Sequence, residues 1–333
     1  MAVGRANRRA FIAGLSSAAA WPLLSAMPAV AQQGWKIARV GVLTPGGSDR
    51  TPSVEAFRKT LQELGYFEGR SIILDFRFAK GHNDALPRLA AELVKIPVDV
   101  IVAGGTTAVQ AAAQVTRSIP IIQAAGGDPV SAGLAASLAH PGGNVTGFTI
   151  RANEPSGKRV ELLKRAFPGI TLVTVLIDPT SIATQPQLRA TEEVADALGV
   201  RLQLLSAGTP EELNTLDPAA LAGSHGLVVL PGGMFWDRRA TIIAFAAAAR
   251  LPAIYPSREF ADDGGLIAYG PNVPDAYRRA ADYVDRILKG AKAGDLPIQE
   301  ASSFDFVVNL HTARLFKLLP SPDFLVGVTE IID

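Results

Sequence analysis

The chain has 333 residues, contains no cysteine, and carries 32 basic against 31 acidic side chains. The absence of cysteine excludes disulfides, thiolate metal sites, a cysteine nucleophile and a lipid-anchored cysteine. The near balance of charge argues against a nucleic-acid-binding protein, because phosphate contacts require an excess of lysine and arginine.

Residues 1–31 have the pattern of an export signal. Three arginines without any acid precede an apolar stretch, and this stretch ends in the A-x-A cleavage pattern of Ala29 and Ala31. We therefore expect a periplasmic protein that is cleaved after Ala31. The pair Arg8 and Arg9 is similar to a twin-arginine signal, which exports folded proteins, while an ordinary Sec signal with two arginines is the alternative.

The size and charge of the mature chain follow from this cleavage. Removing 31 of 333 residues leaves 302, which suggests two lobes at roughly 150 residues per domain. The signal holds three basic residues and no acid, so 29 basic and 31 acidic residues remain, a net charge of −2. We expect a soluble protein that does not bind nucleic acid.

From Ala38 onward, short β-branched runs alternate with alanine- and leucine-rich helical patterns, which is typical of βαβ units on a parallel sheet. The first unit has a strand at Val40–Leu43, a helix over Val54–Leu64 and a stop at Gly65. Further strands are predicted at Val98–Val102 and Ile119–Ile122, each beside a helical pattern.

The second half of the chain repeats this order. A strand at Leu172–Ile177 is followed by a helix that ends at Leu198 before Gly199, with strands predicted again at Leu227–Leu230 and Leu251–Ile254. From Leu43 to Gly65 the spacing is 22 positions, and from Leu176 to Gly199 it is 23. The sequence therefore predicts an α/β protein of two doubly wound, parallel-sheet lobes.

Ligands of open parallel sheets bind outside the carboxyl ends of the strands, so two facing lobes would form a cleft. The candidate ligand-binding residues all follow predicted strands. They are Pro45, Gly46, Gly47, Gly105, Thr106, Thr107, Gly127 and Asp128 on the first wall, and Asp178, Gly232, Gly233, Phe235, Tyr255 and Ser257 on the second. For each glycine, close approach to a ligand competes with a simple role in a tight turn.

The sequence lacks the motifs of the common enzyme classes. No G-x-S-x-G elbow, Walker A loop, H-E-x-x-H motif or G-x-G-x-x-G fingerprint occurs, and the four histidines lie far apart. Asp128 and Asp178 fall on opposing walls, as the two carboxylates of a glycosidase would. Both precede a proline, however, where an aspartate commonly accepts hydrogen bonds from its own turn. We expect no catalysis, no cofactor and no metal.

Several segments together point to a family. They are Phe57–Tyr66, Leu89–Val94, Gly127–Val130, Ser137–Gly147, Leu251–Tyr255, Arg258–Phe260, Gly264–Leu266, Tyr269–Asn272 and Ile287–Pro297. On these segments the chain resembles, nearly from end to end, the substrate-binding proteins of ABC transporters that are related to tryptophan- and tyrosine-binding importers. The departures are Asp178-Pro179, where members often have Asn-Pro, and Gly232-Gly233, where they often have Asp-Pro.

The resemblance implies the type I periplasmic-binding-protein fold, with two lobes that are joined by three crossovers and close on a ligand. We place the crossovers near Thr149–Arg151, Tyr269–Pro271 and Ser302–Phe306, so a helix over Asp275–Leu288 would return to the first lobe. Lobe 1 would then comprise residues 36–149 and 271–302, and lobe 2 residues 150–270 and 303–333.

The resemblance also suggests roles for single residues. Thr106 and Thr107 could hold a ligand carboxylate, and Asp128 or Asp178 could bind an ammonium group. Phe235, Trp236 and Tyr255 could enclose an apolar or aromatic group, while packing in the core is the alternative for Phe235 and Trp236. Because two departures fall on the second wall, the identity of the ligand does not carry over.

The expected function is therefore that of a monomeric periplasmic binding protein that captures a small organic ligand, such as an amino acid or related carboxylate. Its expected partner is an ABC permease in the inner membrane. Two alternatives stay open at this point. The closed lobes could signal to a membrane receptor kinase, or the protein could be an exported enzyme that uses Asp128 and Asp178.

Overall fold

The computed structural model describes residues 37–150 and 153–333. The predicted signal residues Arg8, Arg9, Ala29 and Ala31 lie outside the described residues. Within the described ranges, no helix combines the length and the apolar character that crossing a membrane requires.

Six parallel strands form the first sheet, in the spatial order β11-β5-β4-β3-β1-β2. The strands are β1 (Ala38–Thr44), β2 (Ile72–Phe78), β3 (Val100–Gly104), β4 (Ile121–Gly126), β5 (Val145–Thr149) and β11 (Gln299–Glu300). The helices with this sheet are α1 (Pro52–Glu63), α2 (Leu86–Val94), α3 (Thr106–Val115) and α10 (Val273–Leu288), with the short helices η1 (Asn83–Ala85) and η3 (Ala293–Asp295). We call these elements lobe 1.

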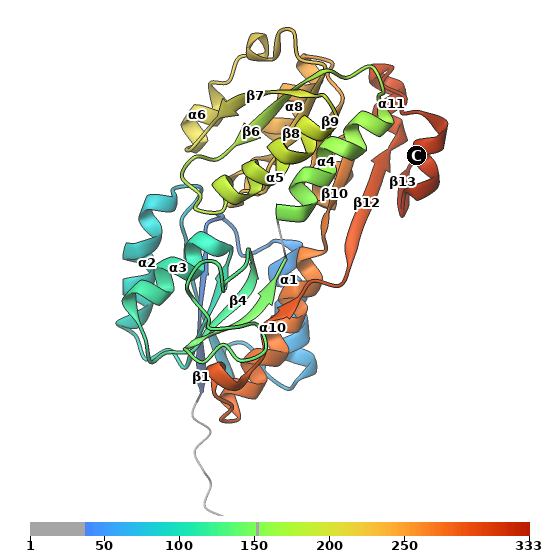
Figure 1. Cartoon of the computed structure of the whole chain (residues 1–333). Helices are drawn as coiled ribbons and strands as arrows, with labels where there is room; N and C mark the ends of the chain where they lie inside the picture. Colours follow the sequence, from blue (N-terminus) through green and yellow to red (C-terminus); the bar gives the residue numbers. More distant parts are fainter. Residues whose placement is uncertain (1–36, 151–152) are drawn as a thin grey trace, which may run out of the picture. The chain divides into compact units, whose positions relative to one another are not determined.

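Both faces of the first sheet are buried, because successive side chains of a strand point to opposite faces. Val100 and Val102 pack with α1 and α10 in one core, whereas Ile101 and Ala103 pack with α2 and α3 in another. Figure 1 shows these two helix pairs flanking the strands. The late helix α10 is fixed to lobe 1 by Asp285, which accepts a 3.0 Å hydrogen bond from the Tyr66 hydroxyl.

Seven strands form the second sheet, in the order β13-β12-β10-β9-β8-β6-β7. They are β6 (Leu172–Ile177), β7 (Arg201–Ser206), β8 (Gly226–Val229), β9 (Ala253–Tyr255), β10 (Ile267–Pro271), β12 (Phe304–Asn309) and β13 (Glu330–Ile332). The helices are α4 (Asn153–Ala166), α5 (Thr184–Ala197), α6 (Pro210–Asn214), α7 (Gly233–Asp237), α8 (Arg239–Ala248), α9 (Arg258–Asp262) and α11 (Leu310–Phe316), with η2 (Pro218–Leu221) and η4 (Pro322–Gly327). We call these elements lobe 2.

The chain passes between the lobes three times, from β5 to α4, from β10 to α10 and from β11 to β12. The predicted fold class is thereby confirmed, with one difference: β12, and β13 parallel to it, run antiparallel to β10. The passages explain this difference. Strand β10 ends where the chain leaves lobe 2, and the chain returns at the same end, so β12 must run in the opposite direction. The residue boundaries of the lobes stay a prediction.

Local sequence signals explain how the helices that matter for the site begin. Helix α1 starts with Thr51, whose hydroxyl accepts a 3.2 Å hydrogen bond from the Val54 N–H, followed by Pro52 in the first turn. Between β3 and α3 the backbone takes a positive φ of 86° at Gly105, a conformation that side chains with a Cβ disfavour. This turn directs the start of α3 back over the end of the sheet.

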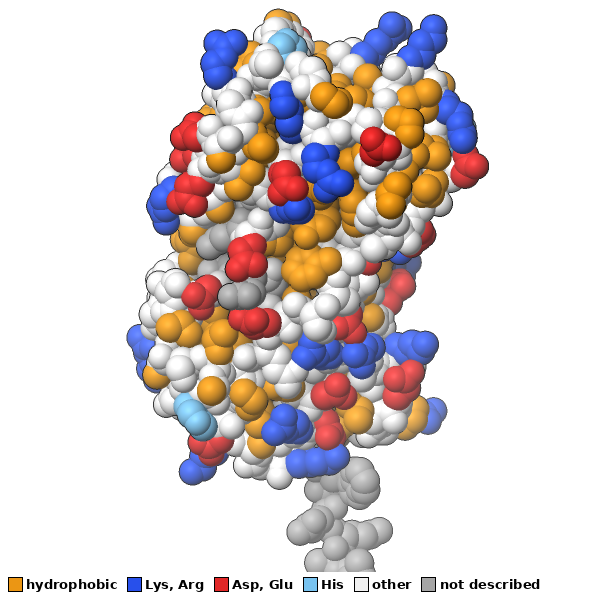
Figure 2. Space-filling view, turned by 45° about the vertical axis from the view of Figure 1, so that its right-hand side comes forward, with side chains coloured by type: hydrophobic (Ala, Val, Ile, Leu, Met, Phe, Trp, Pro, Cys, Tyr) orange, Lys and Arg blue, Asp and Glu red, His pale blue; other side chains and the backbone are white. Residues whose placement is uncertain are grey.

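Figure 2 shows charges of both signs interspersed over one face of the molecule, with apolar side chains gathered on the lobe that carries the C-terminal elements. Leu315, Leu319, Val326 and Ile331, in or near α11, η4 and β13, are exposed.

Candidate functional site

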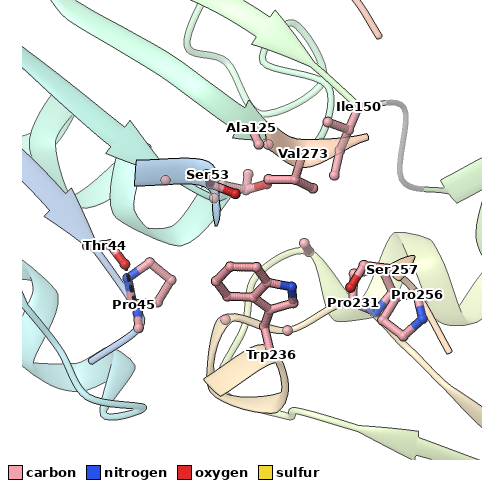
Figure 3. A pocket seen from close by; sticks show the side chains of 18 of the residues that line it. Thr44, Pro45, Ser53, Ala125, Ile150, Pro231, Trp236, Pro256, Ser257 and Val273 are labelled. Carbon is pink, nitrogen blue, oxygen red and sulfur yellow. Dashed lines mark hydrogen bonds between the residues drawn. The ribbon is translucent and has the colours of Figure 1, made fainter. Parts of the chain in front are cut away.

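A cavity of about 190 Å³ lies at the carboxyl ends of both sheets and is lined by both lobes. Much of its wall is apolar, and this part includes Pro45, Val54, Ile150, Pro231, Trp236, Pro256, Pro271 and Val273. Figure 3 shows the Trp236 indole in the middle of the cavity, with Pro45 on one side and Ser257 on the other. A cavity whose wall combines apolar side chains with placed polar groups is typical of a site for a small organic molecule.

The lobe 1 wall consists mainly of backbone and hydroxyl groups. It comes from the loop after β1, the start of α1, the β3–α3 turn and the end of β4. At its centre the Gly127 N–H donates a 2.8 Å hydrogen bond to the Thr106 hydroxyl oxygen. Since a hydroxyl also has a proton to donate, Thr106 keeps the capacity to donate to a ligand.

The lobe 2 wall carries the larger and the charged side chains. Trp236 and Asp237 belong to α7, Ser257 follows β9, and Arg159 and Gln187 come from α4 and α5. The Trp236 indole N–H donates to the Glu259 carboxylate at 3.3 Å, which fixes the orientation of the ring.

Most of the residues predicted from the sequence do line this cavity. They are Pro45, Gly46, Gly105, Thr106, Thr107, Gly127, Gly232, Gly233 and Ser257. Gly47 lies next to them and lines a neighbouring pocket, and its N–H donates to the Asp237 carboxylate of the opposite lobe.

Neither predicted acid lines the cavity. The Asp128 side chain is exposed and accepts hydrogen bonds from the Val130 N–H at 2.9 Å and the Ser131 hydroxyl at 2.5 Å. Asp178 is 1% exposed and accepts from the Thr180 N–H at 2.9 Å and the Thr180 hydroxyl at 2.6 Å. In both loops a proline, which has no backbone N–H, follows the aspartate. The carboxylate accepts hydrogen bonds from residues after this proline and so stabilises its own turn.

Asp178 has an additional partner in lobe 1, since the Asn83 amide donates to it at 3.1 Å. Burial raises the pKa of Asp178, although the hydrogen bonds from Thr180 and Asn83 oppose this shift. The residue therefore links two loops across the lobes without facing the cavity.

Phe235 and Tyr255 also lie away from the cavity, in the core of lobe 2. They are 0% and 1% exposed, and the Tyr255 ring stacks on Phe260 with centroids 4.9 Å apart. Tyr255 is buried because it is the last residue of the buried strand β9. Phe235 points into the core from α7, whereas the next residue of the helix, Trp236, points into the cavity.

The structure adds residues that the sequence interpretation did not include, among them Ser53, Asn83, Arg159, Gln187, Asp237 and Tyr277. The sequence pattern of α4 contains one indication that Arg159 is unusual. It lies on the buried face of α4 between Ser156 and Leu162–Leu163, at a spacing where an apolar residue would be expected.

Arg159 is completely buried. Its Nε donates to the Tyr269 carbonyl at 2.8 Å and its Nη1 to the Ser156 hydroxyl at 3.2 Å. Burial lowers the pKa of Arg159 to about 9, so the guanidinium is charged at neutral pH. No ion pair between described residues includes Arg159.

Asp237 is the acidic counterpart in this cavity. Burial raises its pKa, while the hydrogen bond from the Gly47 N–H and the charges of Arg239 and Arg238 oppose the shift. On the opposite lobe, burial and then the charge of Asp237 raise the pKa of Tyr277 to about 12. The cavity thus contains one cationic and one anionic side chain among its described lining residues.

The family model described as "ABC transporter substrate binding protein" matches residues 40–331. The chain belongs to this family. Members are ligand-binding proteins of transporters that work outside the cytoplasm.

Individual relatives agree with this assignment. The chain is 25% identical over 264 residues to the tyrosine-binding protein of Clostridioides difficile, covering 79% of this chain and 76% of that protein. A conserved domain protein from Vibrio cholerae has 26% identity and a TM-score of 0.80, with 89% of this chain and 100% of that chain covered. A Streptococcus pneumoniae ABC domain in complex with L-Trp has 23% identity and a TM-score of 0.77, with 88% and 100% covered.

These findings confirm the predicted family, the type I periplasmic-binding-protein fold and the predicted general function. The protein is a solute-binding protein of an ABC transporter and takes a small organic ligand.

Proposed function

We propose that the mature protein captures its ligand in the periplasm, in the cavity between the two lobes, and passes it unchanged to a permease in the inner membrane. It acts as a monomer. The N-terminal signal that contains Arg8 and Arg9 directs its export and is cleaved after Ala31. The ligand contacts include Gly105, Thr107 and Ser257.

The observation that carries this proposal is the composition of the cavity wall. Both lobes contribute their strand-end loops to one cavity, and the three passages of the chain join these lobes. A ligand in this position contacts both lobes at once, so its binding favours the closed arrangement that a permease can recognise. The 25% identity to a tyrosine-binding protein further supports a small amino-acid-like ligand.

A thermal-shift screen over amino acids, nucleosides and small carboxylates tests the proposal. A ligand at 100 times its dissociation constant stabilises the folded state by about 2.7 kcal/mol. Calorimetry then gives the affinity, and mass spectrometry of the released compound shows whether it is unchanged. Release of a chemically altered compound would refute the binding-only function.

Trp236→Ala tests whether the cavity is the binding site. Loss of the ring that lies across the cavity should weaken binding by about 10- to 100-fold, since buried aromatic anchors contribute on the order of 2 kcal/mol or more. Phe67→Ala is the matched control, because Phe67 is an aromatic residue that is 50% exposed and lies outside the cavity. Equal affinities in the two variants would place the ligand elsewhere.

A further inference from the structure

Unpaired polar atoms gather around the cavity. Within the described ranges, eight buried side-chain nitrogen or oxygen atoms lack a hydrogen-bond partner. Four of these belong to residues that line the cavity: Ser53 Oγ, Arg159 Nη2, Gln187 Oε1 and Ser257 Oγ. Buried polar groups are normally paired, because leaving them unpaired is costly. Their concentration at one place indicates that a ligand supplies the missing partners.

Of these four groups, Arg159 has the highest energetic cost when it is left unpaired, because it carries a charge. A buried cation without an anion is more costly than a buried neutral group. The hydrogen bonds of its Nε and Nη1 hold the guanidinium in place and leave Nη2 unpaired among the described residues. The side chain is therefore oriented before any ligand arrives.

Asp237, the acidic residue of the described lining, does not neutralise Arg159. Its carboxylate accepts from the Gly47 N–H, and the charges that act on it are those of Arg239 and Arg238. Burial lowers the pKa of Arg159 and Tyr269 opposes this shift, and no ion pair between described residues joins Arg159 to an acidic side chain. An anion that enters the cavity could consequently pair with Arg159 without displacing an acidic side chain from it.

Ser257 supplies a second donor near Arg159. Arg159 and Pro256, the residue before Ser257, adjoin the same glycine: a Cβ at Gly270 would lie 3.4 Å from Arg159 Nη2 and 1.8 Å from the carbonyl oxygen of Pro256. Figure 3 shows Ser257 beside Pro256 at one end of the cavity, with the Trp236 ring extending away from it. Gln187 Oε1 is an acceptor and so does not belong to an anion site.

We propose that Arg159 Nη2 and the Ser257 hydroxyl bind a carboxylate of the ligand, whose apolar part lies along Trp236. This inference rests on the proposed function and specifies the chemical class of the ligand. One guanidinium matches a singly charged carboxylate, with which it forms charge-assisted hydrogen bonds. Arg159 is the only lysine or arginine among the described lining residues, so a phosphate dianion would retain an unbalanced charge.

Binding assays with acid and amide pairs test the chemical class. The probes are acetate, hexanoate, phenylacetate, L-leucine and L-phenylalanine, each compared with its primary amide, together with inorganic phosphate. We expect at least one acid to bind, and its amide to bind about 10- to 100-fold more weakly, because the charge-assisted hydrogen bond is lost. Failure of every acid, equal binding of acid and amide, or preference for phosphate would overturn the assignment.

Arg159→Met tests the residue. Carboxylate affinity should fall about 10- to 100-fold, while the melting temperature of the ligand-free protein should not fall, because the uncompensated buried charge is removed. A residue with a purely structural role would give the opposite pattern. Arg117→Met is the control, because Arg117 is exposed and lies outside the cavity.

Two further outcomes separate this inference from the proposed function. If Arg159→Met does not fold, Ser257→Ala serves instead, with an expected loss of about 3- to 10-fold toward the acid and little change toward the amide. A neutral compound that binds tightly in a Trp236-dependent manner would overturn the carboxylate site and leave the proposed function intact. Absence of binding by any compound would contradict both.

Discussion

The two walls of the cavity differ in what they offer a ligand. Lobe 1 presents glycine backbone and hydroxyl groups in the turns after β3 and β4, whereas lobe 2 presents the guanidinium of Arg159, the Trp236 ring and the carboxylate of Asp237. Backbone groups suit many ligands, while oriented charged and aromatic side chains discriminate between them. We therefore expect ligand selection to reside mainly in lobe 2, with lobe 1 closing over the bound molecule.

Gly233→Val should have a larger effect on ligand binding than the Asp237 and Asp178 variants described below, because it hinders the approach of the two lobes. A Cβ at Gly233 would lie 2.3 Å from the Pro45 Cγ of lobe 1, so the lobes could approach only if Pro45 moved. Overpacking costs about 1–3 kcal/mol, which corresponds to a loss of affinity of roughly 5- to 150-fold. Calorimetry measures this loss.

Small-angle scattering adds a structural readout for the same variant. We expect the radius of gyration of the unchanged protein to decrease when a confirmed ligand binds, and that of Gly233→Val to decrease less. Gly143→Val provides the control, because nothing lies within 4 Å of a Cβ at Gly143. Full affinity in Gly233→Val would show that the two walls do not need to meet there.

Asp237→Asn should have a smaller effect, visible mainly in the pH dependence of stability. Burial raises the pKa of Asp237 in the folded state, so the folded state binds more protons than the unfolded state just below that pKa. The Asp237 carboxylate therefore lowers the free energy of unfolding at neutral pH. This destabilisation disappears as the pH falls from the pKa of the folded state to the pKa of the unfolded state.

Asparagine removes this dependence and can still accept from the Gly47 N–H. We expect Asp237→Asn to have a melting temperature at pH 7 equal to or above that of the unchanged protein, with the difference shrinking toward pH 4. Thermal unfolding monitored by circular dichroism across this range measures it. A lower melting temperature at pH 7 would show that the charge stabilises the contact between the walls.

Asp178→Asn should have the smallest effect on binding. The carboxylate does not line the cavity, and the oxygen of asparagine can accept both hydrogen bonds from Thr180 within the turn, so only the bond from Asn83 is lost. The ligand affinity, measured by calorimetry, should change by no more than about twofold. This corresponds to much less than the 1.4 kcal/mol of a tenfold change. A tenfold loss would return Asp178 to the ligand-binding residues.

The sequence predicted the fold well because its signals are local. The β-branched run Leu172–Ile177 coincides with β6, and the helix expected over Asp275–Leu288 lies within α10. The direction of β12 could not be inferred from its residues, because it follows from where the chain re-enters lobe 2. Strand pattern determines that a segment is a strand but carries no information on its orientation.

The site was less accessible to sequence analysis. Turn residues such as Gly105 and Thr106 could be placed, since strand-end loops must meet at one edge of a parallel sheet. Arg159 could not, because its partner Tyr269 is 110 positions away and only the packed structure shows that the guanidinium reaches the cavity. The same limit applies to Phe235 and Trp236, adjacent residues of which only the second faces the cavity.

The position of α10 has a consequence for how the protein is made. This helix covers one face of the first sheet, where Ala280 and Val284 join the same core as Val40 and Val42, although nearly all of lobe 2 precedes α10 in the sequence. During synthesis from the N-terminus, α1 can cover only part of this face, and the part under α10 stays uncovered until residues up to 288 have left the ribosome. The core of lobe 1 therefore cannot be completed before most of lobe 2 has been synthesised.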